Sequence, residues 1–162
     1  WGASFKDNSV TGGATLDTHI HDVDVARFIF GEPDRVFASE FCEPPNYQVV
    51  TTTLGFGSTT AIINCSWDSA YTKAFTFGFR ARFEDASMVC EDGAITVTRC
   101  GCEPEQIELE PTDGVTEEIR HFIGTVISGE ENKLNPPESS LMSVRLIEKI
   151  RESASTRQSI KL

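Results

Sequence analysis

The middle of the chain shows one strand pattern after another, with no helical pattern between them. Residues 49–65 are rich in Thr, Val and Ile and are interrupted at residues 55–58, where a hairpin turn fits. Residues 86–99 predict a second hairpin, because the Asp92-Gly93 step favours a tight turn between two strands. A chain with this centre has to form a sheet in which sequential strands pair antiparallel.

A further strand is predicted at residues 75–83 from strict alternation. One set of positions is apolar and the intervening set carries Thr, Gly and Arg, so one face is apolar and the other is mixed. We expect the apolar face to pack against helices. The apolar set is Phe75, Phe77, Phe79, Ala81 and Phe83, and the mixed set is Thr76, Gly78, Arg80 and Arg82.

Helical patterns lie on both sides of these strands. The first helix is expected to open after Gly12-Gly13 and to continue to about Phe30, followed by a capping Gly31. A second is expected over residues 116–129 with Thr116 as its N-cap, and a third begins after Pro136-Pro137. The apolar stripe of the third helix is Leu141, Val144, Ile147 and Ile150.

One helix, several consecutive strands and then two helices are typical of an α+β fold. We expect a largely antiparallel or mixed open sheet with helices packed on one face. No repeat and no long linker divides the sequence, so residues 1–162 are predicted to form a single domain. The chain is too short for a (β/α)₈ barrel, which needs about 250 residues.

The charge balance narrows the choice of partners. Lys and Arg number 14 against 25 Asp and Glu, which gives a net charge of −11. Such a chain repels phosphate backbones, so we expect no nucleic-acid partner. Apolar runs such as residues 61–63 are far shorter than the roughly 20 residues of a membrane span, and the N-terminus does not resemble a signal peptide. We therefore expect no membrane partner and a cytoplasmic location.

The five cysteines lack the paired spacing of a disulfide framework. A zinc site formed by Cys90, Cys100 and Cys102 with His121 is an alternative, although its spacing departs from that of structural zinc sites. We expect buried or half-buried thiols on strands, and no metal.

The segment that could support chemistry lies within the first predicted helix. On a continuous helix Asp17, His21 and Asp24 share one face at spacings i, i+4 and i+7. A carboxylate beside an imidazole can orient it and keep it basic, as a general acid or base near neutral pH requires. The alternative is a polar helix face that only meets solvent.

A second interpretation of the same residues is a metal site. Residues 17–21, Asp-Thr-His-Ile-His, look like the paired-His motif of amidohydrolases, in which both histidines bind a catalytic metal. Those enzymes need further His ligands on later barrel strands. Only His121 remains here, inside a predicted helix, and the chain is too short.

A third interpretation extends along nearly the whole chain. Residues 12–24 read Gly-Gly-x-x-x-Asp-x-x-x-His-x-x-Asp, and Gly31-Glu32-Pro33 and a strand at residues 36–38 follow. This pattern resembles the substrate domain of the Gfo/Idh/MocA oxidoreductases. Further pieces follow in the family's order and extend the resemblance from about Ser9 onward: residues 79–83, 118–122, 127–129, 137–141 and 148–154.

The resemblance implies the C-terminal half of a two-domain enzyme. In this family an N-terminal Rossmann domain binds NAD or NADP, and the C-terminal α+β domain supplies the substrate pocket and forms the oligomer through its open sheet face. The substrate is a sugar, a cyclitol such as inositol, or a related polyol. Asp17 and His21 fall on the family's catalytic positions, where the His acts on the hydroxyl proton and the Asp orients it.

Two departures from the family pattern matter. His19 stands where the family usually has a small residue, so His19, together with Trp1, is a candidate substrate contact. The Rossmann domain is absent from the sequence, and Gly55-Phe56-Gly57 lies between two strands and cannot cradle a pyrophosphate. No residue here is predicted to bind cofactor, and this fragment alone is expected to be inactive. The alternative function is a non-catalytic sugar-binding or scaffolding module with the same fold.

Overall fold

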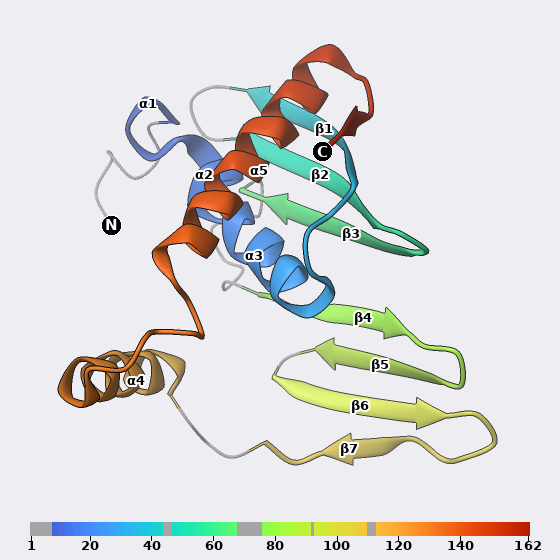
Figure 1. The fold of residues 1–162 in the computed structure, drawn as a ribbon. Helices are drawn as coiled ribbons and strands as arrows, with labels where there is room; N and C mark the ends of the chain where they lie inside the picture. Colours follow the sequence, from blue (N-terminus) through green and yellow to red (C-terminus); the bar gives the residue numbers. More distant parts are fainter. Residues whose placement is uncertain (1–7, 44–46, 68–75, 92, 110–112) are drawn as a thin grey trace. The chain divides into compact units, whose positions relative to one another are not determined.

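The computed structural model describes residues 8–43, 47–67, 76–91, 93–109 and 113–162 (Figure 1). The chain divides into two compact units. The first unit comprises Trp1–Ala70 and Lys133–Leu162, and the second comprises Tyr71–Asn132. The prediction of a single domain over residues 1–162 stays a prediction.

The first unit contains a four-stranded antiparallel sheet with helices on one face. The strand order is β3-β2-β1-β8. In Figure 1, α3 and α5 lie on the same side of this sheet. Its elements are α1 (Asn8–Thr11), α2 (Gly13–Asp17), α3 (His19–Phe30), β1 (Arg35–Glu43), β2 (Tyr47–Phe56), β3 (Thr59–Ser66), α5 (Pro137–Thr156) and β8 (Ile160–Lys161).

The second unit contains another four-stranded antiparallel sheet, in the order β4-β5-β6-β7. Its elements are β4 (Phe79–Arg82), β5 (Ala86–Glu91), β6 (Ala94–Arg99), β7 (Glu105–Ile107) and α4 (Gly114–Ser128). The predicted α+β class with antiparallel strands is confirmed, as are both predicted hairpins. The strands form two sheets, where we expected one.

The strand predicted at residues 75–83 is shorter in the structure. Only Phe79–Arg82 is a strand, and Phe75 lies outside the described residues. The register places Phe79 beside Cys90, and Cys90 beside Ile95, so the predicted apolar face continues across the sheet. The packing of helices on that face stays a prediction.

The core of the first unit lies between its sheet and α3 and α5. Alternate residues of each strand face the helices, because successive side chains point to opposite faces. The buried apolar residues include Val36 and Ala38 of β1, Val50 and Leu54 of β2, Ile63 and Cys65 of β3, Val23 and Ala26 of α3, and Leu146, Ile147 and Ile150 of α5.

The buried stripe of α5 differs from the predicted one. Leu141 is 48% exposed and Val144 is 41% exposed, whereas Ser143 and Ser153 are buried. A strict three-residue repeat drifts around a helix of 3.6 residues per turn, so it cannot stay on one face. Ser153 is buried because its hydroxyl accepts a hydrogen bond from the Ala38 backbone N–H at 2.9 Å.

The prediction for the C-terminal end of α4 is confirmed, and the prediction for its N-terminal end is corrected. Gly129 ends the helix in the left-handed conformation, at φ 68°. The N-cap is Asp113 and not Thr116, because the Asp113 carboxylate accepts from the Thr116 backbone N–H at 3.3 Å. An Asp at this position caps a helix as well as a Thr does.

The predicted first helix is interrupted. α2 ends at Asp17, Thr18 has φ −119° and ψ −51°, and α3 begins at His19. Gly31 follows α3 as expected, at φ 83°. The prediction of one continuous helix from after Gly13 to about Phe30 was therefore wrong at Thr18.

The Gly12-Gly13 pair is required by the start of α2. Both glycines have positive φ, at 77° and 69°, which side chains rarely tolerate. A Cβ on Gly13 would also overlap the side-chain oxygen of Gln48. The motif therefore lets α2 approach β2 closely.

None of the described helices is long and apolar enough to cross a membrane.

Candidate functional site

The two predicted catalytic residues lie on either side of the break at Thr18. Asp17 is the last residue of α2 and is partly exposed, and His21 lies in the first turn of α3 and is exposed. His19, which lies between them, and Val23, which follows them, are fully buried. The side chain of His21 is therefore accessible, while His19 and Val23, two positions before and after it, enter the core.

The predicted helix face shared by Asp17, His21 and Asp24 is corrected by the structure. Asp17 belongs to α2 and the other two residues belong to α3, so helical spacing does not relate Asp17 to His21. In the described part of the chain no ion pair joins His21 to Asp17. Their relative position depends on how the sheet holds the break.

Gln48 of β2 holds the start of α2. Its side-chain oxygen accepts from the Ala14 backbone N–H, and its side-chain nitrogen donates to Thr15 Oγ1 at 3.2 Å. The same nitrogen also donates to Glu40 of β1, whose carboxylate accepts from the Thr15 hydroxyl at 3.0 Å. Sequence reasoning missed Gln48; its only signal was an amide side chain at the start of a Thr- and Val-rich strand.

Trp67 contacts the break itself. Its indole Nε1–H donates to Thr18 Oγ1 at 2.9 Å, and its backbone N–H donates to the Gln48 carbonyl at 2.8 Å. Sequence reasoning missed Trp67, because the strand pattern of residues 49–65 ends before it.

His19 lies in the core, with none of its surface exposed. Its Nε2 is 2.8 Å from Thr52 Oγ1 of β2, and its Nδ1 is buried with no hydrogen-bond partner among the described residues. Burial lowers the pKa of His19 from 6.5 to about 4. The predicted substrate contact of His19 stays a prediction, and Trp1 lies outside the described residues.

The low pKa of His19 has a consequence for stability. As the pH falls below about 6.5, the unfolded chain takes up a proton that the folded chain accepts only near pH 4. We therefore expect the free energy of unfolding to fall by about 2 kcal/mol between about pH 7.5 and pH 5 through this residue. Urea unfolding of the wild type and of His19→Leu at several pH values measures this change, and the variant should lose this part of the pH dependence.

His121 provides the matched control, because it is exposed and bonds to Asn132 Oδ1 at 3.2 Å. His121→Ala should keep the pH dependence of the wild-type free energy of unfolding. A titration of the wild-type His19 ring by NMR tests the same expectation without a variant, and a midpoint above about pH 6 would contradict it.

The surroundings of the break are acidic. Burial, together with the charges of Asp22 and Asp17, raises the pKa of the Cys65 thiol to about 11. Burial also raises the pKa of Asp22, while the imidazole of His21 lowers it. Cys65 is therefore a protonated core thiol and not a nucleophile.

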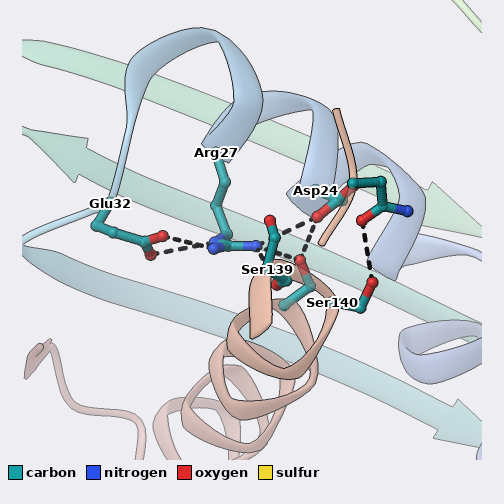
Figure 2. A network of polar contacts seen from close by, with 7 residues as sticks. Asp24, Arg27, Glu32, Ser139 and Ser140 are labelled. Atoms are coloured by element: carbon teal, nitrogen blue, oxygen red, sulfur yellow. Dashed lines mark hydrogen bonds and ion pairs between the residues drawn. The ribbon is translucent and has the colours of Figure 1, made fainter. Parts of the chain in front are cut away.

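Asp24 belongs to a separate polar network around the guanidinium of Arg27 (Figure 2). Arg27 Nε donates to Glu32 at 3.1 Å, and its Nη1 donates to Asp24 at 3.2 Å and to the Ser139 carbonyl at 2.9 Å. Ser143 Oγ accepts from the same Nη1 at 2.5 Å and donates to Asp24. Asp24 therefore ties α3 to the start of α5.

Metal ligation finds no support in the described ranges, where no group of three or more His, Cys, Asp or Glu side chains could hold a metal ion. The zinc alternative required Cys90, Cys100 and Cys102 together. Cys90 is buried, and the other two are exposed.

Comparison with known proteins assigns the family. The sequence profile of the GFO/IDH/MocA C-terminal domain matches residues 1–96. The chain therefore belongs to the Gfo/Idh/MocA C-terminal domain family.

Relatives and solved structures agree with this assignment. D-xylose 1-dehydrogenase (NADP(+)) 2 of Haloferax volcanii is 28% identical over 164 residues, covering 96% of this chain and 50% of the relative. Aldose-aldose oxidoreductase from Caulobacter crescentus, solved with glycerol, superposes with a TM-score of 0.76 at 22% identity, covering 96% of this chain and 49% of that one.

UDP-N-acetylglucosamine 3-dehydrogenase from Acidithiobacillus ferrooxidans has a TM-score of 0.75 at 17% identity, covering 92% of this chain and 50% of that one. At these identities the solved structures show the fold. The chain spans about half the length of the proteins it matches.

Proposed function

We propose that this chain is the substrate-binding and catalytic half of an NAD(P)-dependent oxidoreductase that acts on a sugar, a cyclitol or a related polyol. The observation that carries the proposal is the break at Thr18. It leaves His21 exposed and Asp17 partly exposed at the motif positions of the family, while His19 and Val23 are buried.

The chemistry proposed for this chain is proton transfer. His21 takes the proton of the reacting hydroxyl while the carbon that bears it loses a hydride and becomes a carbonyl. Asp17 orients the imidazole and stabilises its charged form, which is the role a carboxylate has beside a general base. The nicotinamide of NAD or NADP, when bound, accepts the hydride.

The cofactor site is proposed to lie outside this chain. Gly55-Phe56-Gly57 is followed by β3, so it sits in a strand-to-strand turn. A pyrophosphate cradle needs a Gly-rich loop that opens a helix. We therefore assign NAD or NADP mainly to a Rossmann half, and no cofactor-binding residue to this chain.

The substrate class is supported by the names of the relatives. One acts on D-xylose with NADP, and the solved structures are named for an aldose and for a UDP-linked amino sugar. Each of these substrates has a ring with several hydroxyl groups. One such hydroxyl is the group that His21 would deprotonate.

The test uses the complete reading frame that contains this chain. Should that frame encode no Rossmann half, the uncovered half of the Haloferax relative is fused to the N-terminus. We expect reduction of NAD or NADP with at least one member of a panel of aldoses, cyclitols and nucleotide sugars. Sugar binding by calorimetry without turnover would instead support the alternative, a non-catalytic sugar-binding or scaffolding module.

We also propose that the protein forms homo-oligomers through the open face of its sheet. In the first unit the face opposite the helices carries Phe37, Phe41 and Ile62, which are 44%, 59% and 67% exposed. Phe37 of β1 and Ile62 of β3 are both paired with Thr53 of β2, so the three residues form one row across that face. Sedimentation should show at least a dimer at tens of micromolar, and Ile62→Asp should shift it to monomer.

A further inference from the structure

Thr18 is the residue at which the first helix is interrupted, and it lies between the two proposed catalytic residues. A continuous helix would set the spacing of Asp17 and His21 through its own hydrogen bonds. Because α2 ends before Thr18 and α3 begins after it, the spacing depends on the contacts that hold Thr18.

The backbone of Thr18 connects both helices. Its N–H donates to the Ala14 carbonyl at 3.1 Å, which closes the last turn of α2. Its carbonyl accepts from the His21 N–H at 3.2 Å, in the first turn of α3. A rotation of Thr18 would therefore move His21 relative to Asp17.

The side chain of Thr18 is held by the sheet. Trp67 extends the β2–β3 ladder, because its backbone N–H donates to Gln48, so its position is fixed by the sheet. An indole has a single N–H donor, and that of Trp67 donates to Thr18 Oγ1 at 2.9 Å.

Two further sets of contacts anchor the helices on either side of the break. Gln48 holds the start of α2 through Ala14 and Thr15. His19 holds the start of α3 through Thr52, at 2.8 Å. The bond between Trp67 and Thr18 joins the sheet to the residue between these two anchored helices.

We propose that Trp67 and Thr18 are positioning residues for the reaction. Through their hydrogen bond they set the separation of His21 from Asp17, and neither needs to touch the substrate. This inference rests on the proposed function, since it concerns the same pair of residues.

The test compares four variants of the protein assembled for the proposed function. Thr18→Val keeps the shape and removes the acceptor, Thr18→Ser keeps the acceptor, and Trp67→Phe removes the donor while keeping an aromatic ring. The fourth combines Thr18→Val with Trp67→Phe. Thr156→Val is the control, because it removes a hydroxyl bond to Glu152 at 2.8 Å at the far end of α5.

We expect Thr18→Val and Trp67→Phe each to lower kcat by about 10- to 100-fold with KM changed less than about threefold, because a small misplacement of a catalytic group has effects of this size. The double variant should resemble either single variant, because both remove one bond. Thr18→Ser and Thr156→Val should keep wild-type kcat. Additive losses, or a loss confined to KM in Trp67→Phe, would overturn the proposal.

Hydrogen exchange gives a readout that does not require activity. Exchange of the His21 amide should become faster in Thr18→Val and Trp67→Phe, and should stay slow in Thr18→Ser. Unchanged protection of that amide would overturn the inference even in an inactive protein. A wild type with no dehydrogenase activity, in contrast, would count against the proposed function alone.

Discussion

Replacing His21 by Ala should lower kcat by a factor of about 10² to 10⁴, because general acid or base assistance is typically worth that much. The cofactor affinity should stay nearly unchanged, since no cofactor-binding residue is assigned to this chain. Asp17→Asn should lose less, because it keeps the shape of the carboxylate and removes only its charge. Steady-state kinetics of the complete protein measure these effects.

His121→Ala is the control for this experiment, because it removes an exposed imidazole that lies on α4. It should leave kcat unchanged. A His21→Ala protein that kept more than about a third of the wild-type kcat would refute the catalytic assignment. The exposed polar residues of α3 would then be explained as a helix surface that only meets solvent.

The second large effect concerns the free energy of unfolding. The Arg27 side chain is 5% exposed, whereas Asp24 and Glu32 are 45% and 58% exposed. The Glu32 carboxylate, followed by Asp24, raises the pKa of Arg27, so the guanidinium stays charged in the folded state. Removing both carboxylates in Asp24→Asn with Glu32→Gln should cost about 1 to 3 kcal/mol, because the buried guanidinium loses its charged partners, which are themselves partly exposed.

Arg27→Met should cost less than that double variant. It removes the buried charge and leaves the two carboxylates where water can reach them, and an apolar replacement for a buried ion often changes stability little. Urea unfolding compares the variants. The exposed pair Arg120–Glu117 is the control, since Glu117→Gln should leave stability nearly unchanged. Arg27→Met proving the less stable protein would contradict the expectation.

Several elements were predictable because their causes are local. The hairpin turn after Phe56 and the helix ends at Gly31 and Gly129 follow from residues next to them in sequence. Strand alternation likewise predicted the α+β class. The Gly12-Gly13 motif was recognised as part of a family pattern, and its physical reason, the close approach of Gln48, became visible only in the structure.

Other features were not predictable because their causes are distant in sequence. The buried stripe of α5 includes Ser143 and Ser153, whose hydroxyls meet Arg27 and the edge of β1. Periodicity of apolar residues cannot show that a serine is buried by a partner more than a hundred residues away. The same limit applies to His19, which the sequence suggested as a substrate contact and which the structure places beside Thr52.

The sequence by itself determined the fold class, the two hairpins, the family resemblance and the identity of Asp17 and His21 as the candidate pair, because turn chemistry, alternation and motif spacing act over a few residues. Only the tertiary structure decided that the helix carrying this pair is interrupted at Thr18. The physical reason is that three residues of the sheet region hold this segment: Gln48 bonds to α2, Thr52 bonds to the start of α3, and Trp67 bonds to Thr18 at the break. Each of these hydrogen bonds joins residues 30 or more positions apart.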